Sequence, residues 1–138
     1  MTEKMAIVLF SGTVDKILAA GIITSGAIAM DMDVDIFLSF WGLAAFHKDM
    51  AGKDMRMSKD FKDMAPMFLK AMQKKNIPSW YDTLKKAKGM GNVKIHACSM
   101  TMDVMEWKKG DFVDLVDDVI GVGSFIGMAS DAKMTLFI

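Results

Sequence analysis

Short apolar runs alternate along this chain with longer segments of helical periodicity. Continuous apolar runs of about five to seven residues, bounded by glycine or polar residues, are typical of strands buried on both faces of a sheet. The pattern therefore predicts five strands, at Met5–Phe10, Val34–Phe40, Val93–Ala97, Val119–Val122 and Met134–Ile138.

The intervening segments carry apolar residues three and four positions apart, which predicts helices. The first begins at a candidate N-cap, Thr13, and its apolar side runs to Ala29. The second begins at Pro66, and the third at the capping-box-like pair Ser79 and Asp82. Two shorter helices are predicted at 103–107 and 124–130, and segment 111–118 is either a short helix or an irregular connection.

Strands that alternate with helices imply βαβ units with right-handed crossovers and a mostly parallel sheet. We therefore predict a three-layer α/β/α fold with a mainly parallel five-stranded sheet, in one domain that spans residues 1–138. Segment 47–64, HKDMAGKDMRMSKDFKDM, interrupts this pattern with three copies of Lys-Asp-Met and little apolar periodicity. We interpret it as an exposed, mobile insertion.

Glycines and small polar residues directly follow four predicted strands. In a parallel sheet these turns share the carboxyl edge, where open α/β sheets bind their ligands and where helix N-termini offer N–H groups to anions. The only cysteine, Cys98, lies at this edge and is the candidate catalytic residue. The candidate binding residues around it are Ser11, Gly12, Thr13, Trp41, Gly42, His96, Ser99, Met100 and Gly123.

Two interpretations of Cys98 remain open at this point. An unpaired cysteine is often a small buried filler, whereas a cysteine beside helix N-termini has a lowered pKa and reacts as a thiolate. The turns lack the G-x-G-x-x-G of a dinucleotide site and a phosphate-binding P-loop, and the chain has no C-x-x-C for a self-contained dithiol cycle. No metal site and no cofactor is indicated.

The histidines and methionines also leave alternatives open. His96 lies two residues before Cys98, on the same face of a strand, so it is either a base or donor for the sulfur or a satisfied core histidine. His47 is either a solvated loop residue or a gate. The sixteen methionines fill the core or an adaptable interface, bind Cu(I) with the thiolate, or surround the sulfur with apolar groups.

Composition narrows the choice of partners and compartment. Basic and acidic residues both number 17, so no basic excess indicates nucleic-acid binding. Mean hydropathy is high at +0.26, yet the longest uncharged stretch, Ile17–Met30, has 14 residues, fewer than the roughly 20 that a membrane helix needs. We expect a cytoplasmic protein without a transmembrane segment, whose apolar surface lies in a doubly covered sheet, a subunit interface, or both.

Several stretches resemble the DsrE/DsrF-like family, in particular its DsrE2-type branch. They are KMAIVLFSGTVDKILAAGIITSGAIAM, VDIFLSFWGL, VKIHACSMTMDVM and MTLFI, of which FWG and A-C-x-M-x-M-D are the most specific. The resemblance implies a doubly wound, flavodoxin-like fold, a homo-oligomer and a role in sulfur trafficking. It implies that Cys98 accepts sulfane sulfur, as a persulfide or thiosulfonate, and passes it to a TusA-like or rhodanese-like partner.

Three hypotheses follow for function. The favoured one is a sulfur carrier or sulfurtransferase that acts through Cys98, with N–H groups of the Gly12-Thr13 and Ser99-Met100 turns binding the anionic adduct and Trp41 excluding water. The second is a non-catalytic module that binds a soft metal or a small anion. The third is a structural subunit in which the cysteine is buried.

Overall fold

The structure is a computed structural model that describes residues 2–138. Its centre is one sheet of five strands in the order β4-β3-β2-β1-β5, and every pairing is parallel. The α/β fold with a parallel five-stranded sheet is thus confirmed, with strand ends that differ from the predicted ones by at most two residues. The strands are Lys4–Leu9 (β1), Asp33–Leu38 (β2), Val93–Cys98 (β3), Asp118–Ile120 (β4) and Met134–Phe137 (β5).

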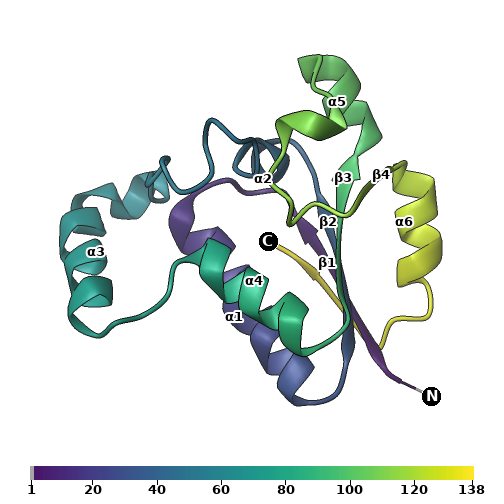
Figure 1. The fold of residues 1–138 in the computed structure, drawn as a ribbon, viewed down its shortest axis with the longest axis horizontal. Coiled ribbons are helices and arrows are strands. Elements are labelled where there is room, and N and C mark those ends of the chain that lie inside the picture. The colour runs from purple at the N-terminus through teal and green to yellow at the C-terminus, as the bar shows by residue number, and fades with distance from the viewer. Residues whose placement is uncertain (1) are drawn as a thin grey trace.

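Six α-helices and two 3-10 helices connect the strands (Figure 1). Ser79 caps its helix as predicted, because its Oγ accepts a hydrogen bond from the Asp82 N–H at 3.2 Å. The helix after Cys98 begins at once rather than at Asp103, because Cys98 itself is its N-cap. The elements are Val14–Ala29 (α1), Trp41–Ala44 (α2), Lys59–Met64 (η1), Ala65–Lys74 (α3), Trp80–Met90 (α4), Ser99–Met105 (α5), Lys109–Asp111 (η2) and Val122–Ala129 (α6).

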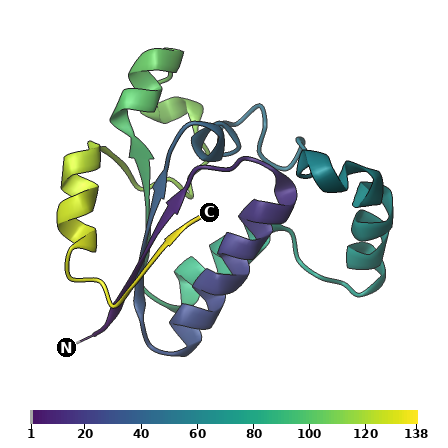
Figure 2. The ribbon, with the colours of Figure 1, turned by 180° about the vertical axis from the view of Figure 1, so that it is seen from behind.

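The two faces of the sheet differ in chemistry. On one face, α1 and α4 pack against each other and cover a continuous apolar surface that includes Ile7, Ile36 and Ile95. Figures 1 and 2 show α6 alone on the opposite face. There Phe125 of α6 closes a smaller apolar cluster, and charged side chains share the face with it.

The chain changes from one face to the other after β4. The first two crossovers use α1 and α4, and the segment between β3 and β4 adds Phe112, Leu115 and Val116 to the same apolar core. The next connection, α6, leads from β4 to β5 on the other face. The chain therefore leaves the carboxyl ends of β3 and β4 toward opposite faces, whereas the strand order itself reverses between β1 and β5.

Segment 47–64 lies outside the core, and none of its residues is buried. It is nevertheless joined to the start of α1: Val14 N–H donates to the Arg56 carbonyl at 2.8 Å, and Ser58 Oγ donates to Asp15 Oδ2 at 2.6 Å. Helix α3 then extends to the side of the molecule, away from the sheet (Figure 1), and touches the core only with partly buried side chains. The predicted exposure is confirmed, and the mobility stays a prediction.

Most methionines lie outside the buried core, so the interpretation that they fill the core is wrong for most of them. Met5 and Met102 are the two that are buried among residues 2–138. A long, flexible side chain is tolerated at the surface, where it contacts adaptable partners. Those classed as exposed are Met30, Met55, Met64, Met67, Met90, Met100, Met105 and Met134.

Candidate functional site

Cys98 is the last residue of β3 and the N-cap of α5. Its side chain points to the α6 face and packs in a cluster with Ala6, Phe37 and Phe125. The rings of Phe37 and Phe125 stack with centroids 4.9 Å apart, so α6 is held firmly against the strands there. The residue is 6% exposed, so the thiol is covered in this conformation.

Cys98 lies at the carboxyl edge of the sheet, where β3 and β4 send their connections to opposite faces. Cys98 pairs with Ile120 in the β3–β4 register. The next residue along each strand, Ser99 or Gly121, lies beside the other: a Cβ on Gly121 would be 3.8 Å from Ser99 Oγ. Open α/β sheets bind ligands outside the carboxyl ends of their strands, above all where the strand order reverses, which here is between β1 and β5. The thiol therefore lies at the ligand-binding edge, with β2 and β1 between it and that reversal.

Helix α5 is tied to the turn that follows β2. The buried Thr101 accepts a hydrogen bond at its Oγ1 from the Phe40 N–H, at 3.1 Å. Phe40 has φ 48° and ψ −109°, a conformation that costs a residue with a Cβ roughly 1–3 kcal/mol and persists only where neighbours impose it. Neither residue's role has a local signal in the sequence, since the contact joins positions 61 residues apart.

Gly12 and Gly42 are required by packing. A Cβ on Gly12 would lie 2.3 Å from the Trp41 carbonyl oxygen, and one on Gly42 would lie 2.0 Å from the Leu9 carbonyl oxygen. The turns after β1 and β2 thus press backbone against backbone, which only glycine permits. The FWG turn owes its glycine to this close approach.

A cleft of about 650 Å³ opens at the carboxyl end of β1. Four predicted binding residues line it, namely Ser11, Gly12, Thr13 and Trp41. Cys98 does not line it. The structure therefore divides the predicted site in two: this cleft, and a separate group at the carboxyl ends of β3 and β4 that contains Cys98, Ser99 and the start of α6 near Gly123.

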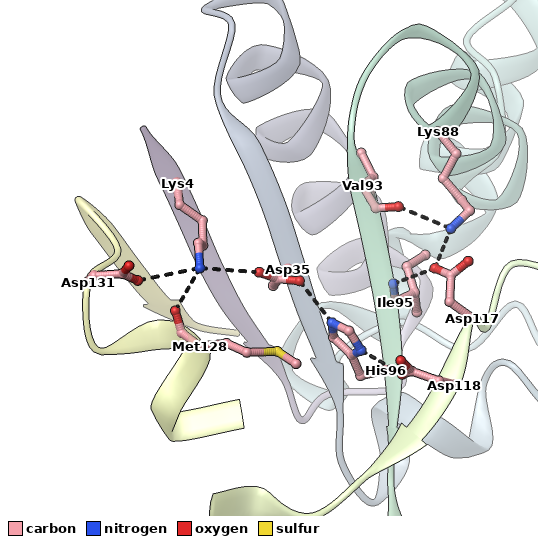
Figure 3. Close-up of polar contacts among 10 residues, drawn as sticks. All are labelled: Lys4, Asp35, Lys88, Val93, Ile95, His96, Asp117, Asp118, Met128 and Asp131. Atoms are coloured by element: carbon pink, nitrogen blue, oxygen red, sulfur yellow. Dashed lines mark hydrogen bonds and ion pairs between the residues drawn. The ribbon is translucent and has the colours of Figure 1, made fainter. Parts of the chain in front are cut away.

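His96 is fully engaged by carboxylates. Its Nδ1 lies 2.6 Å from Asp118 Oδ1, and its Nε2 lies 2.9 Å from Asp35 Oδ1 (Figure 3). Both ring nitrogens are thereby occupied, so His96 makes no hydrogen bond to the sulfur. The structure therefore supports the alternative in which His96 is a core histidine with satisfied hydrogen bonds. It does not support the alternative in which His96 is a base or donor for Cys98.

The charges around His96 extend across four strands. Lys4 Nζ lies 3.9 Å from Asp35 Oδ2 and 3.4 Å from Asp131 Oδ1, and it donates to the Met128 carbonyl at 2.9 Å. Burial by itself lowers the pKa of His96, but the hydrogen bonds and charges of Asp35 and Asp118 outweigh it and raise the pKa above 6.5. The strand alternation V-K-I-H-A-C was a sequence signal for a polar stripe on this face.

His47 lies in an aromatic cluster, so its assignment as a solvated loop residue is wrong. Its ring centroid is 5.5 Å from that of Trp107 and 5.9 Å from that of Phe112. Its Nδ1 accepts a hydrogen bond from the Asp49 N–H at 3.1 Å. These contacts bind segment 47–64 to the β3–β4 connection.

The soft-metal alternative concerns Cys98 and the methionines that follow it. Met100 is exposed on α5, and within residues 2–138 no three His, Cys, Asp or Glu side chains are grouped closely enough to hold a metal ion. In the same part of the chain, no helix combines the length and apolarity that a membrane crossing requires.

Comparisons with known proteins agree with this fold. The chain is 35% identical over 158 residues to the uncharacterized protein YrkE of Bacillus subtilis, covering 99% of this chain and 98% of YrkE. It is 25% identical over 157 residues to the sulfur carrier protein DsrE2 of Allochromatium vinosum, with the same coverage.

Two solved structures share the fold. They are MTH1491 of Methanobacterium thermoautotrophicum, a protein of unknown function (TM-score 0.67, 13% identity, 99% of each chain), and the ychN protein of E. coli (TM-score 0.60, 11% identity, 100% of each chain). The model of the DsrE/DsrF/DrsH-like family matches residues 1–137. With the family model matched over the whole sheet and its connections, this chain belongs to the DsrE/DsrF/DrsH-like family.

Proposed function

We propose that this protein is a sulfur carrier in which Cys98 accepts a sulfane sulfur and passes it to a thiol of a partner protein. The observation that carries the proposal is the position of the only cysteine at the carboxyl end of β3 and the start of α5, on the edge of the sheet where open α/β folds bind their ligands. Membership of the family and the 25% identity to a protein named as a sulfur carrier support it.

The transfer is a thiol exchange with no net oxidation. The Cys98 thiolate attacks the outer sulfur of a donor persulfide, the donor S–S bond breaks, and the donor leaves as a thiolate while Cys98 becomes the persulfide. From tetrathionate, the same attack gives a Cys98 thiosulfonate and releases thiosulfate. Since the chain has one cysteine, a second protein, of the TusA-like or rhodanese-like kind, must supply the thiol that removes the sulfur.

The backbone next to Cys98 suits an anionic adduct. Ser99 and Met100 follow directly in the first turn of α5, where N–H groups are not yet used by the helix. Gly121 lies beside Ser99 and, because it has no side chain, leaves space there. The Gly12-Thr13 turn lines the separate cleft, so we assign adduct binding to the Ser99-Met100 turn.

Intact-protein mass spectrometry tests the proposal. Protein prepared without reductant is measured before and after incubation with thiosulfate, tetrathionate or polysulfide, beside Cys98→Ser. We expect a gain of sulfur or of a thiosulfonate group that dithiothreitol reverses and that the variant lacks. A gain that persists in Cys98→Ser, or no gain with any donor under conditions where the thiol is alkylated, contradicts the proposal.

Methionine oxidation is the main interference and can be controlled. One added sulfur atom has the same nominal mass as two added oxygen atoms, and the chain has sixteen methionines. Dithiothreitol removes a persulfide sulfur but does not reduce methionine sulfoxide. Peptide mapping of 93–105 then places the added mass on Cys98 rather than on Met100, Met102 or Met105.

The burial of Cys98 favours one other candidate, a structural subunit with a buried cysteine. At 6% exposure, the thiol resembles a core filler in this conformation. Iodoacetamide distinguishes the two, since a carrier thiol is alkylated in the folded protein and a filler only after unfolding in urea.

We propose further that the protein acts in the cytoplasm as a homo-oligomer. An aromatic row of Phe137, Phe10, Phe40 and Trp41 runs along the carboxyl edge, with successive centroids 5.8, 5.7 and 6.4 Å apart. Phe137 is 72% exposed and Trp41 56%, and exposed apolar patches mark interfaces. Light scattering should show an assembly that Phe137→Asp weakens and that Phe61→Asp, the same change at another exposed phenylalanine, on η1, leaves intact.

A further inference from the structure

Four adjacent strands each contribute one charged side chain to a row beneath α6. The row runs Lys4, Asp35, His96 and Asp118, from β1 to β4 (Figure 3). The histidine side chain is 4% exposed, that of Asp35 15% and that of Asp118 50%. Removing charged side chains from water costs free energy, so each buried member of the row needs a hydrogen-bond or ion-pair partner.

With both partner carboxylates ionised, the geometry requires His96 to carry both ring protons. Carboxylate oxygens only accept hydrogen bonds, and a neutral imidazole has a single N–H. Contacts of 2.6 and 2.9 Å at the two nitrogens are therefore both satisfied only by the imidazolium form. Loss of one proton leaves one carboxylate without its donor.

His96 holds the strand that covers Cys98. Strand β4 has three residues and lies at the edge of the sheet, and its register pairs Asp118 with His96 and Ile120 with Cys98. Ile120 packs in the cluster that contains the thiol, and α6 starts directly after it. One end of β4 is thus anchored by the histidine, and its other end forms the cover.

A second anchor on β4 contains no histidine. The neighbouring Asp117 accepts hydrogen bonds at Oδ2 from the Ile95 N–H, at 2.7 Å, and from Lys88 Nζ (Figure 3). This contact keeps β4 attached to β3 when the first anchor is lost. Loss of the His96 contact should therefore loosen the end of β4 locally rather than unfold the sheet.

We propose that His96 is a positioning residue that controls access to Cys98: as a cation it holds β4 closed over the thiol, and loss of its proton to solvent opens this cover. The inference gives the proposed sulfur carrier its regulation, although the opening itself does not depend on sulfur transfer. The titratable or charged groups on this face are Lys4 from β1, Asp33 and Asp35 from β2, Lys94 and Cys98 from β3, Asp118 from β4, and Asp131 after α6.

Asp118 is the carboxylate that neutral His96 releases. Asp35 is more buried than Asp118, and a buried carboxylate without a hydrogen-bond donor costs more free energy than an exposed one. The remaining N–H of neutral His96 therefore stays with Asp35. Asp118 is half exposed, so water replaces its lost hydrogen bond. The pKa of His96, raised by the two carboxylates, places this release above pH 6.5.

The rate of Cys98 alkylation as a function of pH tests the proposal. Iodoacetamide rates are divided by the thiolate fraction, which is titrated separately by thiolate absorbance in the same protein. The titration of His96 is located by NMR of its ring, with His47→Gln assigning the other histidine. We expect the rate per thiolate to rise roughly tenfold, the equivalent of one lost hydrogen bond to a charged group, as His96 loses its proton.

Two variants make the test specific. Asp118→Asn should react at the fast rate per thiolate at every pH, whereas Asp114→Asn, the same change at an exposed carboxylate in the preceding connection, should keep the wild-type profile. A rate per thiolate in the wild-type protein that is constant through the His96 titration overturns the proposal, and so does an Asp118→Asn profile equal to that of Asp114→Asn.

The result is separable from the test of sulfur loading. Alkylation reports whether the thiol is reached, and mass spectrometry with sulfur donors reports whether it accepts sulfur. If the alkylation rate rises at the His96 titration but no sulfur adduct forms, the control of access by His96 is supported and the sulfur-carrier function is contradicted. If an adduct forms but the rate does not rise, the sulfur-carrier function is supported and the control of access by His96 is contradicted.

Discussion

At the scale of single residues, glycines decide how closely the first two turns approach each other. The sequence predicted Gly12 and Gly42 as ligand-binding residues because they follow strands. The structure gives them a packing reason, since a Cβ at either position would collide with a carbonyl oxygen of a neighbouring segment. A collision between segments 30 residues apart has no local signature in the sequence.

Replacing Gly42 by alanine should lower the free energy of unfolding by about 2–3 kcal/mol, the usual cost of forcing extra atoms into a packed region. The Cβ would lie 2.0 Å from the Leu9 carbonyl, so the α2 turn or β1 must shift. Urea denaturation measures the change.

The matched control for that substitution is Gly89→Ala in α4, where a Cβ would meet nothing within 4 Å. Alanine favours a helix, so this variant should be as stable as the wild type or slightly more stable. Equal losses at both positions would show that close packing at Gly42 is not the cause.

The histidine illustrates a second limit at the residue scale. Strand alternation correctly places His96 on the face of Cys98. Its partners Asp35 and Asp118 are 61 and 22 residues away in the chain, on two other strands. Which carboxylates reach a histidine depends on strand order, so the sequence left a contact between His96 and the sulfur open as an alternative.

At the scale of elements, the start of α1 anchors the exposed segment that follows α2. Asp15 suits the first turn of the helix, as predicted, and its carboxylate also accepts hydrogen bonds from the Ser58 N–H at 3.1 Å and the Ser58 Oγ at 2.6 Å. Burial by itself raises the pKa of Asp15, but the hydrogen bonds from Ser58 and Thr13 outweigh it and lower the pKa. The anchor is therefore intact at neutral pH.

Asp15→Asn should release this anchor and accelerate trypsin cleavage after Arg56 and Lys59 severalfold in the folded protein. The amide accepts less strongly than the carboxylate and carries no charge to favour the Ser58 contacts. Asp60→Asn, an exposed change in η1, serves as the control and should be cleaved at the wild-type rate. Equal cleavage of both variants would contradict an anchoring role for Asp15.

The same contact has a defined pH dependence. Since the pKa of Asp15 is lowered in the folded protein, its stabilising effect is complete above the ordinary aspartate value of 3.8 and is lost as the pH falls through the lowered one. Cleavage of the wild-type segment by an acid-active protease should therefore rise only at strongly acidic pH.

At the scale of the whole molecule, the charged row across four strands links stability to pH. The pKa of His96 is raised above 6.5 on folding, so the folded protein holds the histidine proton more tightly than the unfolded chain. The resulting stabilisation is complete below pH 6.5 and is lost as the pH rises through the folded pKa.

The stability difference between wild type and His96→Gln should therefore be larger at about pH 6 than at about pH 9. Urea denaturation at the two pH values measures it. His47→Gln, which removes the aromatic-cluster histidine, should show the same difference from wild type at both. A His96→Gln difference that does not change with pH would exclude a pKa of His96 that folding raises.

The layered architecture followed from the alternation of apolar runs and amphipathic segments, and the family resemblance pointed to the same fold. The sequence could not reveal the order β4-β3-β2-β1-β5, because strand order depends on the direction of each crossover. That order separates the cleft beside Trp41 from Cys98, although both follow strands at one edge.

The sequence by itself determined the five strands, the parallel sheet and the presence of one cysteine at its carboxyl edge, because apolar periodicity and strand–helix alternation are local properties. Only the tertiary structure decided that Cys98 lies under α6, and that His96 binds two carboxylates rather than the sulfur. Those facts depend on which strands become neighbours and which face each connection crosses, and the folded chain alone fixes both.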